Sequence, residues 1–151
     1  MLEWLWGFKT VAMFDVWTIE HLFSGLSVGN LVKKNIRKHV KNISLIKKFE
    51  SHTSVIRFDI IGVLFLAYLW ETIEHYLESG LAGGGVEYWF QGVEFWSNRI
   101  ISDPLMMIIG YFIALRYPKF IVPARIATGV WLFTHIFLFP NSMFLHTLFF
   151  S

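Results

Sequence analysis

Cysteine is absent from the 151 residues of this chain. Its absence excludes disulfides, thiolate metal sites and cysteine nucleophiles. Two metal-binding signatures are also missing, because the sequence contains neither HExxH nor the Glu-x-x-His spacing of di-iron helical bundles. The first residues lack the basic region and the small-residue cleavage site of a signal peptide, so we expect no cleavable signal.

Apolar residues dominate what is present. Hydrophobic residues make up 55% of the chain and aromatic residues 19%, and the mean hydropathy is +0.52. A soluble domain of this length has no interior large enough for sixteen Phe and seven Trp side chains. The composition therefore predicts an integral membrane protein whose main partner is the lipid bilayer.

Four hydrophobic segments each approach the ~20 residues that a spanning helix needs. They cover approximately residues 11–32, 55–77, 98–115 and 120–139. We therefore predict an all-α fold, an integral membrane four-helix bundle that forms a single transmembrane domain over residues 1–151. The aromatic residues at positions 2–8 and the tail after residue 140 are expected to be short interfacial amphipathic segments.

Charge predicts the orientation of this bundle. A basic run can bind nucleic acid, but between two hydrophobic segments the positive-inside rule is the simpler explanation for the lysines and arginines of loop 33–52. We therefore predict that this loop is cytoplasmic, with no nucleic-acid partner. Both termini are then on the non-cytoplasmic side, as is loop 79–97, which is rich in glycine and aromatic residues. Gly83 to Gly85 are expected to disfavour a helix there.

The most informative stretch is WETIEHYLE, at the end of the second hydrophobic segment. Its ionisable residues are spaced i, i+3, i+4 and i+7, which places them along one face of a helix. Such groups are costly in a membrane unless they face protein, water or an ion. The predicted orientation brings polar residues of the other segments to the same outer depth. The candidate catalytic residues are Glu71, Glu74, His75, Glu20, His21 and Asp103.

Four interpretations of this polar set remain open. The first is a site for a divalent metal such as Zn, Mn or Fe, although adjacent Glu and His side chains point about 100° apart on a helix. The second is metal-free acid–base chemistry between histidine and carboxylate. The third is a proton or cation pathway, and the fourth is a structural network in which Arg99 pairs with Asp103. The candidate metal ligands are Glu71, Glu74, His75, His21 and His135.

Two shorter patterns accompany the polar set. The tetrapeptide TIEH, followed by SGL, occurs at residues 18–21 and again at 72–75. On antiparallel helices the two copies would face each other, and a chance match is the alternative. Gly25 and Gly29 share a helix face with His21, and this small-residue spacing is typical of close helix packing.

The order of the motifs resembles the VanZ-like family of small polytopic membrane proteins. The resemblance covers roughly residues 14–110 and depends on Asp15 with His21-x-x-x-Gly25-x-x-x-Gly29, on Glu71 to Glu74, and on Asn98-Arg99-x-x-x-Asp103 before Gly110. It implies a setting in the cell envelope or in lipid, and it implies no mechanism. The chain departs from the pattern by its second TIEH copy and by Glu78.

Together these observations predict a polar site near the outer face that acts on a lipid or a lipid-linked substrate. Arg99 is expected to contact a phosphate of that substrate. The alternative is a non-enzymatic role, either as an accessory subunit that binds membrane-protein partners or further copies of itself, or as a small proton or cation transporter.

Overall fold

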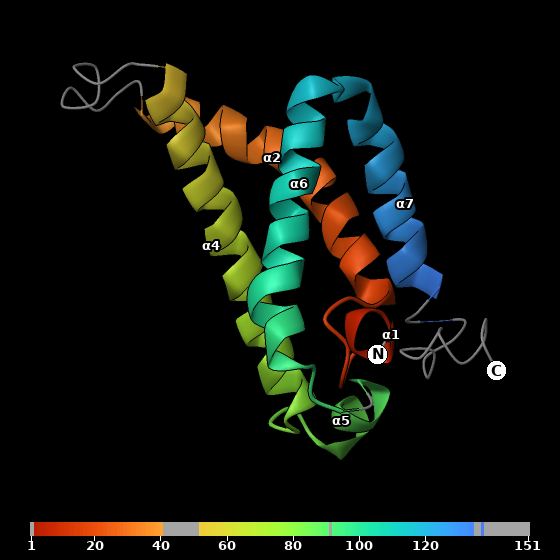
Figure 1. Cartoon of the computed structure of the whole chain (residues 1–151). Helices are drawn as coiled ribbons and strands as arrows, with labels where there is room; N and C mark the ends of the chain where they lie inside the picture. Colours follow the sequence, from red (N-terminus) through yellow and green to blue (C-terminus); the bar gives the residue numbers. More distant parts are fainter. Residues whose placement is uncertain (1, 41–51, 91, 135–136, 138–151) are drawn as a thin grey trace.

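The computed structural model describes residues 2–40, 52–90, 92–134 and 137 (Figure 1). These residues form helices joined by turns, and no strand occurs among them. The predicted all-α fold is therefore confirmed for the described chain. Four long helices alternate in direction along the sequence, and shorter helical segments lie between them (Figure 1).

The helices differ widely in length. The long ones are α2 (Val16–Val40), α4 (His52–Glu78), α6 (Asp103–Arg116) and α7 (Ile121–Phe133). The short ones are α1 (Leu2–Leu5), α5 (Gly84–Phe90), the π-helical turn η1 (Asn98–Ser102) and the 3₁₀ turn η2 (Pro118–Phe120).

The first long helix begins and ends later than the predicted segment 11–32. Its start is fixed by Asp15, whose Oδ1 accepts hydrogen bonds from the backbone N–H groups of Trp17 (2.8 Å) and Thr18 (3.0 Å). The Thr18 hydroxyl accepts in return from the Asp15 N–H (3.1 Å), which completes a reciprocal helix cap. The helix then continues to Val40, so the prediction of a loop from residue 33 was wrong for residues 33–40. Residues 41–51 lie outside the described chain.

The predicted loop 79–97 contains the helix α5, so the expectation that glycines disfavour a helix there was wrong for Gly84 and Gly85, whereas Gly83 lies just before the helix. Gly83 has a φ of 101°, a conformation that suits glycine. Its carbonyl accepts hydrogen bonds from Val86 N (3.0 Å) and Glu87 N (3.2 Å). The glycines thus begin the helix rather than interrupt it. The third predicted segment agrees with η1 and α6, and α7 forms most of the described part of the fourth.

Helices α2 and α6 approach each other closely at two glycines. A Cβ atom added to Gly25 would lie 2.1 Å from the Met107 carbonyl oxygen, and one added to Gly110 would lie 2.2 Å from the Leu22 carbonyl oxygen. Only glycine allows the two backbones to touch in this way. The predicted packing role of the small residues is therefore confirmed, and this crossing fixes the register of α2 against α6.

Two helical stretches are long and apolar enough to cross a membrane, Phe58–Glu78 and Asn98–Arg116. The first belongs to α4 and the second joins η1 to α6. The prediction of four spans extends beyond this finding and stays a prediction. The two stretches run in opposite directions, so the C-terminus of α4 and the N-terminus of α6 lie at the same end of the bundle (Figure 1). The α2 N-terminus lies there too, and we call this the acidic end.

Candidate functional site

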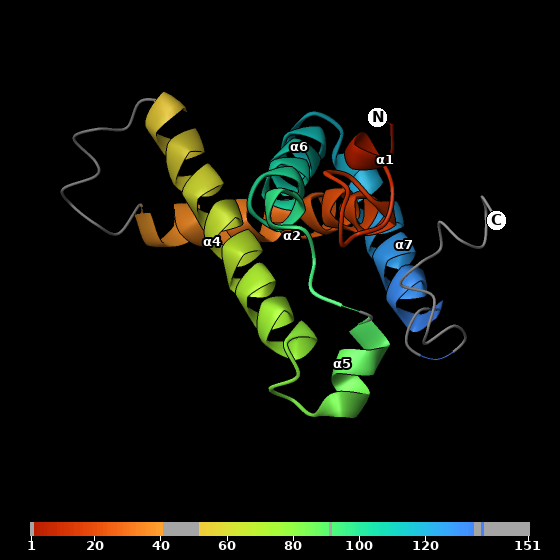
Figure 2. The same cartoon turned by 60° about the horizontal axis from the view of Figure 1, so that its bottom comes forward.

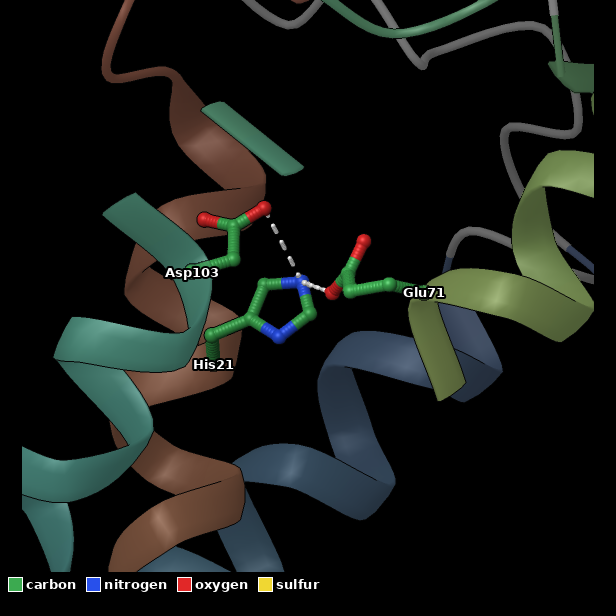
Figure 3. A group of neighbouring side chains, drawn as sticks. All are labelled: His21, Glu71 and Asp103. Atoms are coloured by element: carbon green, nitrogen blue, oxygen red, sulfur yellow. Dashed lines mark ion pairs between the residues drawn. The ribbon is translucent and has the colours of Figure 1, made fainter. Parts of the chain in front are cut away.

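Three buried side chains meet at the acidic end, each from a different helix. His21 comes from α2, Glu71 from α4 and Asp103 from the start of α6 (Figure 3). The His21 Nε2 atom lies 3.4 Å from Asp103 Oδ2 and 3.6 Å from Glu71 Oε1. One ligand atom from each residue lies within 4.8 Å of the other two. We call these three residues the ligand cluster.

The ligand cluster is poorly supplied with hydrogen-bond donors. Glu71 is 2% exposed, and neither of its carboxylate oxygens accepts a hydrogen bond among the described residues. The nearest cationic atom is Arg99 Nε, 3.7 Å from Glu71 Oε2. Asp103 is fully buried, and neither of its carboxylate oxygens accepts a hydrogen bond among the described residues. Burying a carboxylate without donors is unfavourable, and a bound cation would relieve that penalty. One imidazole and two carboxylates form a donor set that suits Zn, Mn or Fe.

A second group of charges surrounds Glu78, two turns further along α4. Glu78 is 1% exposed and forms ion pairs with Lys9 and with Arg99. Its Oε2 also accepts a hydrogen bond from the Glu94 backbone N–H (3.0 Å). Arg99 Nη2 lies 3.6 Å from Glu94 Oε2. We call Lys9, Glu78, Glu94 and Arg99 the ion-pair network. It joins the N-terminal segment, α4 and the turn before α6.

Asn98 connects the ion-pair network to the start of α2. Its Nδ2 donates to Glu94 Oε1 (3.0 Å), and its Oδ1 accepts from the Thr18 hydroxyl (3.3 Å). Burial raises the pKa of Glu94 well above the usual carboxyl range, and the negative charge of Asp103 raises it further. The ligand cluster and the ion-pair network therefore interact electrostatically, through Asp103 and Glu94, although their residues come from different parts of the chain.

A cavity of about 550 Å³ adjoins the ligand cluster. Its lining comes from α2, α4, α5 and α7, and Figure 2 shows α5 beside the end of α4 at this part of the molecule. His21 belongs both to the cavity wall and to the ligand cluster, so a molecule in the cavity would contact one of the three residues of the cluster. The lining residues are Trp17, Glu20, His21, Trp70, Glu74, Gly85, Val86, Trp89, Phe90 and Leu132.

The structure gathers most of the residues predicted for the site. Those buried at the acidic end are Glu20, His21, Glu71, Glu74 and Asp103. Glu20 also accepts a hydrogen bond from the Ser24 hydroxyl (2.5 Å). His75 is exposed instead, and its Nδ1 lies 3.2 Å from Arg99 Nη1, outside the ligand cluster. His135 lies outside the described residues, so its predicted ligation stays a prediction.

The structure differs from two other predictions, the facing pair of TIEH copies and the pairing of Arg99 with Asp103. The TIEH copies do not face each other symmetrically, since Glu20, His21 and Glu74 line one cavity whereas His75 does not. The Arg99 side chain is directed to glutamates instead of Asp103, because its Nη2 pairs with carboxylates of the ion-pair network and its Nε approaches Glu71. Its contact with a phosphate stays a prediction.

Sequence reasoning missed Lys9 and Glu94. Lys9 directly follows the segment 2–8 that we expected to lie in the membrane interface, yet it is 2% exposed and pairs with Glu78. Its carbonyl also accepts a hydrogen bond from Phe95 N (2.8 Å). The N-terminal segment therefore folds onto the acidic end and brings a cation to it. A lone lysine among aromatic residues was the signal available in the sequence.

The chain matches no protein-family model, no curated protein and no solved structure. The resemblance to VanZ-like proteins therefore stays a prediction.

Proposed function

We propose that this chain is an integral membrane protein that spans the bilayer with α2, α4, α6 and α7. Large apolar side chains on the outer faces of α4 and α7 support this, because it is unfavourable to expose so much apolar surface to water. Phe65 of α4 is 65% exposed, and Ile126 of α7 is 63% exposed. Lipid chains would cover both helices.

The charges support one orientation of the bundle. Exposed cations lie at the end opposite to the acidic end, on the last part of α2 and around the turn from α6 to α7. They are Lys34, Lys38, Arg116 and Lys119. Under the positive-inside rule that end faces the cytoplasm. The acidic end, with the N-terminal segment, then lies on the non-cytoplasmic side.

The functional centre in this proposal is a divalent-cation site in the ligand cluster, next to a cavity that takes a lipid or lipid-linked substrate. The observation that carries it is Glu71, a buried carboxylate without a hydrogen bond that points at His21. His21, Glu71 and Asp103 would hold the ion. A bound divalent cation supplies Lewis-acid chemistry. Glu20 and Glu74 would bind or exchange protons with the substrate from the cavity wall.

Metal retention tests the cation site. The protein would be purified in an uncharged maltoside detergent, dialysed separately against zinc and manganese salts, and assayed for bound metal by mass spectrometry. We expect about one ion per chain. In Glu71→Gln the affinity should be at least about tenfold weaker, because the loss of a ligating charge reduces the free energy of metal binding by more than about 1.4 kcal/mol.

Glu87→Gln is the matched control, since Glu87 is an exposed carboxylate of α5. It should retain the metal as the parent protein does. Equal retention by Glu71→Gln and the parent protein, or no retention by the parent, would remove the cation site from the proposal.

A further inference from the structure

Buried carboxylates outnumber cations at the acidic end of the described chain. The cations are Lys9 and Arg99, and both pair with Glu78. A divalent ion in the ligand cluster would offset Glu71 and Asp103. The two carboxylates of the cavity wall, Glu20 and Glu74, form no ion pair with either cation among the described residues. The buried carboxylates of this end are Asp15, Glu20, Glu71, Glu74, Glu78, Glu94 and Asp103.

The polar part of the cavity wall has one sign of charge. Glu20 and Glu74 are its charged residues, His21 is its other polar side chain, and neither lysine nor arginine contributes to it. Glu20 and Glu74 are each 8% exposed, so their carboxylates are largely removed from solvent. A ligand that brings a positive charge into the cavity would complement both of them.

The remaining wall is mainly aromatic. Three tryptophans and Phe90 line the cavity, contributed by α2, α4 and α5. Aromatic faces attract ammonium groups, and cages of such rings recognise quaternary ammonium ligands. One of these rings already contacts an ammonium group of the protein itself, because Lys9 Nζ lies 5.4 Å from the centroid of the Phe90 ring. Aliphatic contacts are available beside them, at Val86 and Leu132.

From this combination we infer that the cavity binds an amphiphile with an ammonium head group and an aliphatic chain. The head group lies between the carboxylates of Glu20 and Glu74 and the tryptophan rings. The chain follows the apolar wall toward α7. This inference names the substrate class of the proposed function and shares its membrane setting, but it does not require the metal.

Fluorescence quenching tests it with three probes that share one brominated alkyl chain. The first carries a trimethylammonium head, the second a neutral hydroxyl head and the third a sulfate head. Bromine quenches tryptophan on contact, so binding in maltoside micelles appears as saturable quenching above the micellar background. We expect the ammonium probe to bind at least about tenfold more tightly than either of the others, as one charge-assisted contact predicts.

Variants locate the binding. Glu74→Gln and Glu20→Gln should each reduce affinity for the ammonium probe by about tenfold and leave the hydroxyl probe unchanged. Glu87→Gln is the control and should change neither. Thermal unfolding of every variant checks that it is folded. Trp89→Phe, which keeps an aromatic ring, should lose part of the saturable quenching but retain the preference for ammonium.

Three results would overturn the inference. These are equal affinity for the three head groups, a preference that survives in the Glu20→Gln, Glu74→Gln double variant, and an affinity for tetramethylammonium, which has no chain, equal to that for the ammonium probe. Repeating the titration with Glu71→Gln separates this inference from the metal site. Ammonium preference without metal retention rejects the metal alone, and metal retention without preference rejects the amphiphile alone.

Discussion

Glu71 and Glu78 occupy the same face of α4, two turns apart, and both are buried. Their surroundings differ. Glu78 has two cationic partners and a backbone donor, whereas neither oxygen of Glu71 accepts a hydrogen bond among the described residues. A satisfied buried charge holds elements together, and an unsatisfied one is retained at a cost in stability. The ion-pair network is therefore structural, and the ligand cluster is the better candidate for function.

The largest effect is expected at Glu78. Glu78→Gln leaves Lys9 and part of Arg99 buried without their carboxylate, and breaking a buried ion pair in this way lowers the free energy of unfolding by about 3–5 kcal/mol. Denaturant titration in maltoside micelles, followed by circular dichroism, measures the change. The exposed Glu87→Gln should stay within about 0.5 kcal/mol of the parent protein. Similar losses in both variants would mean that the ion-pair network contributes little.

The next effect is expected at the glycine crossing, which sets the spacing between His21 and Asp103. In Gly25→Ala the new methyl group meets the Met107 carbonyl, so α2 and α6 must separate. Overpacking of this kind destabilises by about 1–3 kcal/mol. The same titration measures it, and metal affinity should fall as well because the ligand cluster widens.

Gly129→Ala should change the free energy of unfolding in the opposite direction. A Cβ at Gly129, within α7, meets no atom within 4 Å. Alanine should raise the free energy of unfolding by about 0.5–1 kcal/mol, since glycine is unfavourable in a helix. If Gly25→Ala were also stabilising, the close α2–α6 crossing would be wrong.

Glu71→Gln makes the same chemical change as Glu78→Gln at a site with different surroundings. Replacing a buried carboxyl group that accepts no hydrogen bond should leave the metal-free protein within about 1 kcal/mol of the parent, or make it more stable. Denaturant titration with a chelator present tests this. A loss as large as that of Glu78→Gln would mean that Glu71 is a structural residue.

A smaller effect is expected in the pH dependence of stability. The pKa of Glu94 is raised by burial in the folded protein, so the unfolded chain releases this proton at lower pH than the folded chain does. The contribution of Glu94 to the free energy of unfolding is therefore fully present below the pKa that Glu94 has in the unfolded chain. It is lost as pH rises through the pKa that Glu94 has in the folded protein. In Glu94→Gln the decline in unfolding free energy with rising pH should be shallower. An unchanged slope would contradict the raised pKa.

Local patterns in the sequence were sufficient for several of these features. The apolar segments predicted the helices, and the glycine spacing predicted the close crossing. The spacing of the WETIEHYLE stretch also identified the buried polar face of α4, but the predicted face was one residue too wide. Positions 71, 74 and 78 point inward, whereas His75 is exposed. A periodicity of four residues cannot locate the edge of a buried face that closely.

The difference between Glu71 and Glu78 could not be predicted from their own positions. Both have the same spacing and lie on the same face of one helix. Their partners come from elsewhere, since Lys9 precedes α2 and Glu94 precedes η1. Such pairs depend on how the N-terminal segment folds onto the acidic end. That fold is set by tertiary contacts such as the hydrogen bond from Phe95 N to the Lys9 carbonyl, which no local pattern encodes.

The most direct test of the ligand cluster is an anomalous difference map from crystals grown with zinc, recorded at the zinc absorption edge. Our account predicts one peak between His21, Glu71 and Asp103, at about 2.0–2.2 Å from each ligand atom. It also predicts that the peak is absent in Glu71→Gln crystals. A map of the parent protein without a peak at this position, or with its peak at the ion-pair network, would contradict the account.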